Sequence, residues 1–301
     1  MPTRIPRLGA LVAATSLTAA QAAPSPEATA QVQAAAQAIA ELPLLITGDH
    51  AYVQAFPGME ATAPNEQGTQ FVLRPIVLDG VETTRALRVS FVDDEGTPWA
   101  FIDQSMIEVL QGRRMRVVRL DGDGAVLSDS QLQDGRWSTT FYMSGKPVPN
   151  QAERQAGPIH FHPMEYVHTA MMAADPSGGL VASEMDGKPA LVSAPGALEP
   201  VTVTLSGGET FAMDSMSVGS AATGETVRRY AGHGEVLPGV APLPTDIYDH
   251  QAGPGGAITA INQFQDVTYR VLQPGELDAL LAAPVEELVV EASKTAAVAG
   301  E

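Results

Sequence analysis

The chain has 301 residues, and its 35 Asp and Glu against 17 Lys and Arg give a formal net charge of −18. Such a surface repels phosphate backbones and anionic lipid headgroups, which argues against nucleic-acid binding and against membrane attachment through a basic patch. The sequence contains no cysteine, which excludes disulfides, a catalytic or metal-binding thiol, and a cysteine-linked lipoprotein anchor.

The first 22 residues have the pattern of a secretory signal peptide. Arg4 and Arg7 precede an uncharged, mostly apolar run, and Ala20-Gln21-Ala22 then places small residues where a signal peptidase reads. We therefore expect residues 1–22 to be removed and the mature protein to be periplasmic or secreted. No later segment approaches the roughly 18 apolar residues of a transmembrane helix, so we expect no membrane span.

The mature chain is expected to begin with a helix and to continue as strands. Ser25 and Pro26 are typical of a helix start, and the apolar stripe that follows ends at Pro43, which cannot donate the next helical hydrogen bond. Alternation of apolar and polar residues then predicts strands over 71–78, 86–92, 99–102, 115–120 and 137–143. Pro75 marks the first of them as an edge strand or a bulge.

In the middle of the chain, the spacing of apolar residues changes from that of a strand to that of a helix. Val167, Ala170, Met171 and Ala174 have helical spacing, which predicts a helix over 164–174. Strands are expected again over 180–183, 190–192, 201–205, 211–213, 226–230 and 258–271, with a short amphipathic turn through 277–281.

These elements predict a mainly β (α+β) fold. Roughly ten strands, an N-terminal helix and a mid-chain helix are most simply arranged as a single curved antiparallel sheet or a half-open barrel. We expect one β-rich domain over residues 23–283, followed by a loosely ordered tail over 284–301.

The order of elements resembles the LolA-like family of periplasmic lipoprotein-sorting and lipid-carrier domains. The resemblance is carried by Leu243-Pro244-Thr245-Asp246-Ile247-Tyr248-Asp249, a Gly-rich turn and Phe264-Gln265-Asp266-Val267-Thr268-Tyr269, which look like the closing hairpin of such domains. It implies a half-open barrel whose mouth is covered by helices. It also implies a non-enzymatic carrier whose partner is an apolar small molecule or a lipidated protein.

A histidine-rich segment suggests a different chemistry. His160 and His162 point to the same side if the chain is extended there, and Glu165 or His168 would complete a three-ligand site for Zn or another divalent metal. The alternative interpretation is that these histidines lie at a strand-to-helix junction, solvated or bonded to the backbone. The remaining histidines, His50, His233 and His250, lie in segments that look like loops.

Two acidic turns and a group of methionines complete the candidates. Asp121-Gly122-Asp123-Gly124 begins like a calcium loop, but Leu132 stands where the twelfth-position Glu belongs, so a tight hairpin turn is expected. Asp93-Asp94-Glu95-Gly96 is interpreted in the same way. Five methionines are core residues or a soft lining for a lipid chain. They are Met164, Met171, Met172, Met213 and Met216.

Three functional hypotheses follow. The first, which the residues favour, is an exported binding or carrier protein for an apolar ligand in the cell envelope, without a cofactor. The second is a metal-dependent extracytoplasmic enzyme that uses His160 and His162. The third is an envelope interaction protein without a pocket. Neither the ligand nor the oligomeric state follows from the residues.

Overall fold

The computed structural model describes residues 33–34, 36–78, 81–133, 136–143, 145–147, 153–155, 164–174, 179–185, 187–193, 200–206, 212–220, 222–234 and 242–299. Residues 36–40 are helical and lie just before the first strand, as the stop at Pro43 predicted. The described strands of the first half are β1 (Leu44–Ala55), β2 (Phe71–Leu78), β3 (Val81–Val92), β4 (Pro98–Gln111), β5 (Arg114–Asp121), β6 (Val126–Gln133), β7 (Arg136–Met143), β8 (Lys146–Pro147) and β9 (Glu153–Gln155).

The second half begins with the helix α2 (Met164–Ala174), whose bounds are those that the sequence predicts. The strands and helices after it are β10 (Leu180–Met185), β11 (Lys188–Ser193), β12 (Val201–Leu205), β13 (Met213–Ser220), β14 (Gly224–Ala231), β15 (Asp246–Ala252), β16 (Ile258–Val271), α3 (Glu276–Ala282) and α4 (Val285–Ala299). The described residues thus hold sixteen strands where about ten were expected. The unpredicted strands include β8 and β9, of two and three residues, but also β1, which has 12.

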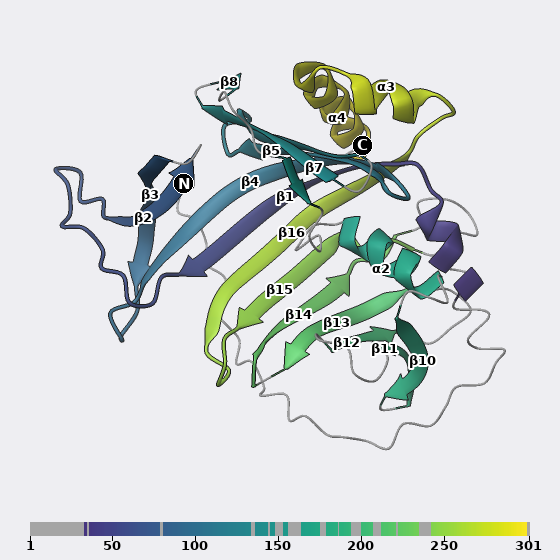
Figure 1. Ribbon diagram of the computed structural model, residues 1–301, viewed down its shortest axis with the longest axis horizontal. Coiled ribbons are helices and arrows are strands. Elements are labelled where there is room, and N and C mark those ends of the chain that lie inside the picture. The colour runs from purple at the N-terminus through teal and green to yellow at the C-terminus, as the bar shows by residue number, and fades with distance from the viewer. Residues whose placement is uncertain are drawn as a thin grey trace.

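The strands form one large, open, antiparallel curved sheet, which confirms the predicted fold class. Its order is β10-β11-β12-β13-β14-β15-β16-β1-β4-β5-β6-β7-β8, and β3 joins β2 to the free part of β4. Figure 1 shows the sheet curving around α2, while α3 and α4 lie on its opposite side. The predicted hairpins β3–β4 and β15–β16 are both present.

The strand β1 is the central strand of the sheet and was not predicted. It pairs with β4 along its whole length and with β16 on its other edge, with a β-bulge between Thr47 and Asp49. His50 therefore lies in the middle of the sheet and His250 lies on β15, so placing them in loops was wrong. The continuous apolar run Leu44-Leu45-Ile46 is typical of a strand that is buried on both faces, which hides the alternation.

The sheet separates two hydrophobic clusters because successive side chains point to opposite faces. Leu44 and Ile46 belong to the cluster that contains α2 and residues 36–40, and we call this side the inner face. Leu45 belongs to the cluster that contains α3 and α4, on the outer face. A smaller cluster around Phe56 and Val72 fills the end of the sheet where β2 and β3 lie.

The C-terminal helices are attached to the outer face by one buried arginine. Arg116 on β5 is 2% exposed and forms a bidentate salt bridge with Asp129 on β6, with N···O distances of 3.0 and 2.8 Å. Its Nη1 also donates to the carbonyl oxygens of Leu280 at 2.9 Å and Ala283 at 2.7 Å. These carbonyls end α3 and have no partner within the helix, so Arg116 satisfies them.

The segment expected as a loose tail is largely helical. Residues 285–299 form α4, and Val285, Leu288 and Ala292 are buried against the outer face. Their spacing of three and four residues places them on one side of the helix, where the apolar sheet covers them. Among the helices of the described residues, none has both the length and the apolar character that crossing a bilayer requires.

Candidate functional site

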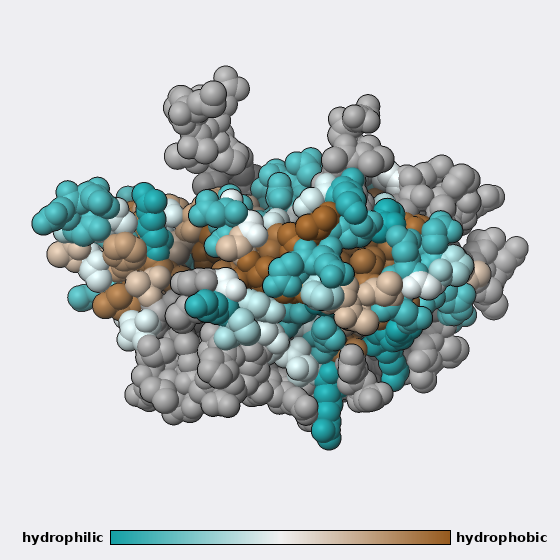
Figure 2. Space-filling model, turned by 90° about the horizontal axis from the view of Figure 1, so that it is seen from above, coloured by the Kyte–Doolittle hydropathy of each residue, from teal (hydrophilic) through white to brown (hydrophobic). Residues whose placement is uncertain are grey.

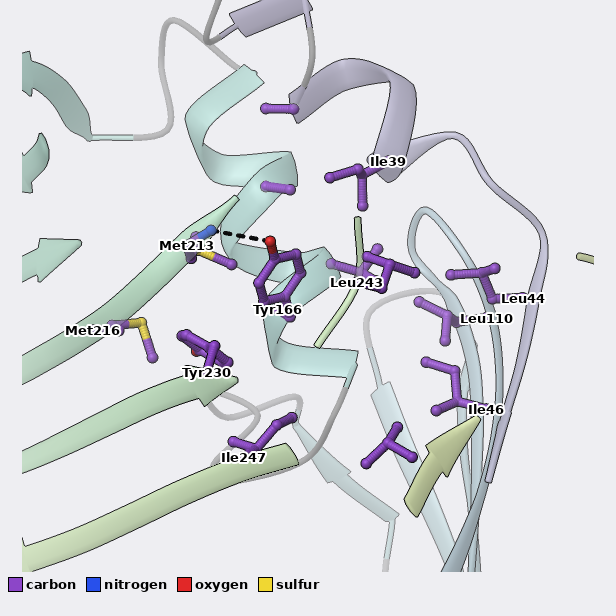
Figure 3. Packing of buried hydrophobic residues seen from close by; sticks show 14 of the residues in the cluster. Ile39, Leu44, Ile46, Leu110, Tyr166, Met213, Met216, Tyr230, Leu243 and Ile247 are labelled. Carbon is purple, nitrogen blue, oxygen red and sulfur yellow. Dashed lines mark hydrogen bonds between the residues drawn. The ribbon is translucent and has the colours of Figure 1, made fainter. Parts of the chain in front are cut away.

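The inner face is a packed apolar surface covered by α2. From the helix, Tyr166, Val167 and Ala170 are fully buried against it. Figure 3 shows these contacts from close by, with Ile39 from the N-terminal helix and Leu44 and Ile46 from β1 on one side of Tyr166. On the other side of Tyr166 the figure shows side chains of β13, β14 and β15, namely Met213, Met216, Tyr230 and Ile247. The curved sheet thus meets its cover helix through a continuous apolar layer.

The hydroxyl of Tyr166 attaches α2 to the first residue of β13. The Tyr166 Oη accepts a hydrogen bond from the Met213 amide at 3.0 Å, the contact that is dashed in Figure 3. It also donates to the carbonyl oxygen of Pro242 at 3.4 Å. Burial raises the pKa of this phenol, so it stays protonated and keeps both roles.

A row of buried polar residues crosses the inner face, and we call it the polar row: His50, Asn262, Asp249, Arg228 and Glu165. It runs over β1, β16, β15 and β14 and ends on α2. The His50 Nε2 lies 3.3 Å from the Asn262 Oδ1, the Asn262 Nδ2 donates to the Asp249 Oδ1 at 3.2 Å, and the Arg228 Nε donates to the Asp249 Oδ2 at 2.8 Å. The Arg228 Nη1 forms an ion pair with Glu165.

The polar row holds one cation between two carboxylates. Burial opposes the charge of Arg228, but Glu165, Tyr230 and Asp249 hold its pKa above the ordinary value. Burial raises the pKa of Asp249, and the contacts with Arg228 and Asn262 act in the opposite direction. The ion pair therefore links α2 to the sheet by a second contact, beside the Tyr166 hydroxyl.

A cavity of about 800 Å³ lies at the β1–β16 bulge. Its lining includes Met106, Leu243 and Val267 from the inner cluster and Ile107, Leu120 and Ala292 from the outer cluster. Gly48, which carries no side chain, lies at the bulge between them. The cavity thus borders both apolar clusters of the molecule.

Acidic residues stand at the part of the cavity that faces solvent. Asp49 and Asp266 line it, and both are exposed. Desolvation and the nearby carboxylates of Asp103 and Asp266 raise the pKa of Asp49. Asp266 has a φ of 52°, in the left-handed region that Asp tolerates better than most residues. The cavity therefore combines an apolar interior with an acidic entrance.

Only two of the four predicted metal ligands, Glu165 and His168, lie among the described residues. His160 and His162 lie outside them. Glu165 lies on α2 with its carboxylate against Arg228, and His168 follows one turn later on the same helix. Burial and the charge of Arg113 lower the pKa of His168, and its Nδ1 has no hydrogen-bond partner among the described residues. In the part of the chain that the structure describes, no group of three or more His, Asp and Glu residues can hold a metal ion.

The methionines divide between core and helix. Met213 and Met216 are buried in the inner cluster, where they pack beside Tyr166 and Tyr230. Met171 and Met172 are half-buried on α2, and the side chain of Met164 lies outside the description. Another methionine, Met106 on β4, lines the cavity and was not among the candidates.

The polar row is the feature that sequence reasoning missed. His50 and Asn262 are 212 residues apart in the chain, so only the pairing of β1 with β16 brings them together. A signal existed for Arg228 and Asp249, since each lies inside a strand at an inward position, where an unpaired charge is costly. The sequence pattern does not show which residue Arg228 or Asp249 pairs with.

No protein-family model and no curated protein sequence matches the chain significantly. Among solved structures, a DUF1329 family protein from Desulfovibrio piger aligns with a TM-score of 0.38 and 10% sequence identity, covering 85% of this chain and 96% of that one. MucB in complex with MucA(peri) aligns with a TM-score of 0.11 and 11% identity, covering 82% and 100%. With TM-scores below 0.5, neither likeness bears on function.

Proposed function

We propose that this protein is an exported binding or carrier protein for an apolar ligand, a lipid or the acyl chain of a lipidated protein. The observation that supports the proposal is the cavity of about 800 Å³ that borders both hydrophobic clusters. This volume falls within the range of roughly 300–1,000 Å³ that is typical of small-molecule sites. The pattern of a signal peptide supports a site of action in the periplasm or outside the cell.

The lining suits a flexible apolar chain. Met106, Leu243 and Val267 offer apolar contact from the inner face, and Met106 adapts its shape because its side chain is unbranched. Asp49 and Asp266 at the entrance favour a ligand whose polar end stays in water. An open curved sheet with a helix on its inner face is also the arrangement that the LolA-like resemblance implies. We extend the proposal to a carrier of that type.

The test is to block the entrance of the cavity without disturbing the fold. Ser293 on α4 is exposed and lines the cavity, so Ser293→Trp places an indole across the opening. The control is Val290→Trp, because Val290 lies on the same helix, is 59% exposed and does not line the cavity. Binding of a fluorescent, uncharged monoacylglycerol to the purified protein is measured by titration, and bound lipid by mass spectrometry after gentle purification.

We expect the unchanged protein and Val290→Trp to bind the monoacylglycerol alike, and Ser293→Trp to bind it about ten-fold more weakly or not at all. Equal binding by all three proteins, or a ligand-free protein that takes up no monoacylglycerol, would contradict the proposal. Circular dichroism of each variant verifies that the sheet is intact.

A further inference from the structure

The outer face carries an exposed aromatic patch at the end far from α3 and α4. Phe91 on β3 is 51% exposed and Phe101 on β4 is 50% exposed. Trp99 lies on the same face of β4. Val53 on β1 pairs with Phe101, and Ile261 on β16 pairs with Val53. We call Phe91, Trp99, Phe101, Val53 and Ile261 the aromatic patch. Exposed apolar residues that gather in this way mark contact surfaces more often than single ones do.

The patch is held rigid by its own contacts. The rings of Phe91 and Trp99 stack with centroids 5.6 Å apart and planes 12° from parallel. The Trp99 Nε1 donates to the Asp93 Oδ2 at 3.0 Å, while the Asp93 Oδ1 accepts from the amides of Glu95 and Thr97. Since these rings lose little freedom when a partner binds, the surface is preorganised for association.

Two acidic turns flank the patch. Asp94 and Glu95 extend from the β3–β4 turn at one side. On the other side, Asp103 lies two residues beyond Phe101 on the same face, and Gly122 in the β5–β6 turn lies against it, which brings Asp121 and Asp123 near. Arg88 on β3 is the nearest cation along the chain, and these five carboxylates outnumber it.

We propose that the aromatic patch is a docking surface for a protein segment that presents an apolar side flanked by Lys or Arg residues. Apolar contact with the rings would provide the binding energy, and the acidic turns would select a basic partner and speed its approach. A protein is favoured over a membrane because the net charge of −18 repels anionic lipid. This surface is separate from the cavity, so the two proposals stand or fall independently.

The test uses a synthetic amphipathic peptide of Leu and Lys, with a Leu and Glu peptide of the same pattern for comparison. The protein has two tryptophans, so Trp137→Phe leaves Trp99 as the fluorescent reporter. Binding is measured for this protein, for Phe91→Ser/Phe101→Ser, and for the control Phe141→Ser. Phe141 lies on β7, outside the patch, and is 43% exposed, so Phe141→Ser controls for the loss of an exposed aromatic ring without a change of charge.

We expect the Lys peptide to change the Trp99 emission, with binding that weakens as salt rises, and the Glu peptide to bind at least about ten-fold more weakly. The double variant should lose about ten-fold or more in affinity, and Phe141→Ser should bind like the unchanged protein. Equal binding by the double variant would show charge attraction alone and overturn the proposal. So would a lack of binding, equal binding of both peptides, or binding to phosphatidylglycerol vesicles that needs the same two rings.

Discussion

Desolvation and two neighbouring carboxylates disfavour the ionised form of Asp49, and this effect on stability can be measured. The pKa of Asp49 in the folded protein lies above the ordinary value. In the pH interval between these two pKa values, the folded protein therefore binds a proton more tightly than the unfolded chain does. The stability contributed by this group is therefore present at low pH and falls as pH rises through the interval. At neutral pH the ionised Asp49 lies near the carboxylates of Asp103 and Asp266.

We expect Asp49→Asn to be modestly more stable than the unchanged protein at neutral pH, and this advantage to shrink as the solution is acidified. Urea unfolding at a series of pH values measures the difference. Asp94→Asn is the control, since Asp94 is exposed in the β3–β4 turn. Parallel stability curves for Asp49→Asn and the unchanged protein would show that folding does not raise the pKa of Asp49.

Arg116 joins the end of α3 to the sheet through buried hydrogen bonds. Arg116→Ala leaves Asp129 buried without its partner and the carbonyl oxygens of Leu280 and Ala283 without their donor. We expect a loss of about 3–5 kcal/mol in the free energy of unfolding, measured by denaturant titration.

The double variant Arg116→Met/Asp129→Leu separates the two causes of that loss. It removes the stranded carboxylate, so we expect it to recover much of the stability while the carbonyls of α3 still lack a donor. If the double variant were as unstable as Arg116→Ala, the buried charge of Asp129 would not be the reason.

Among the elements, α2 is the one whose attachment to the sheet is most easily weakened. Tyr166→Phe keeps the ring in its apolar surroundings but removes the acceptor of the buried Met213 amide. We expect a loss of about 1–3 kcal/mol and faster hydrogen exchange at the Met213 amide than in the unchanged protein. Tyr248→Phe, at a tyrosine that is 43% exposed, should change neither quantity. Unchanged exchange in Tyr166→Phe would mean that the apolar contacts alone fix α2.

The elements also show how far sequence reasoning reaches. The bounds of α2 and of β12 follow from periodicity, because these segments carry a clear spacing and end at turn residues. The two acidic turns are hairpin turns as predicted: Asp121 accepts from the amides of Asp123 and Ala125, just as Asp93 does from its own neighbours. Such bonds are local, so a local pattern reveals them.

The strand β1 and the polar row escaped prediction because they depend on distant partners. Gly48, Asp49 and His50 look like a loop until β16 supplies Asn262 and Phe264, whose ring stacks on His50 at 4.4 Å. Likewise, the pairing of Glu165 with Arg228 follows from where α2 crosses the sheet, which no spacing encodes. The aromatic patch was not predicted either, although Phe91, Trp99 and Phe101 lie on the two sides of one predicted turn.

At the scale of the whole molecule, two candidate surfaces lie on different parts of one sheet. The cavity lies at the bulge near α4, and the aromatic patch lies at the end that holds β2 and β3. Figure 2 shows apolar side chains along the middle of its view bordered by polar ones, and further apolar residues among polar ones toward the left, the side on which β2 and β3 lie in Figure 1. A carrier that holds its ligand in one place and docks in another needs such a separation.

The pairing of β1 with β16 has a consequence for how the chain acquires its structure. Thr47 and Thr268, whose hydroxyls meet at 2.6 Å across this pair, are 221 residues apart. Strands β4–β9 build outward from one edge of β1, and β10–β16 form a meander that reaches its other edge only when the last strand is made. The first strand of the sheet can therefore pair on both edges only after the last strand has been made. Closing so long a loop of chain costs conformational entropy and is slow. Until it happens, one edge of β1 stays open, with unpaired backbone groups that other chains can join.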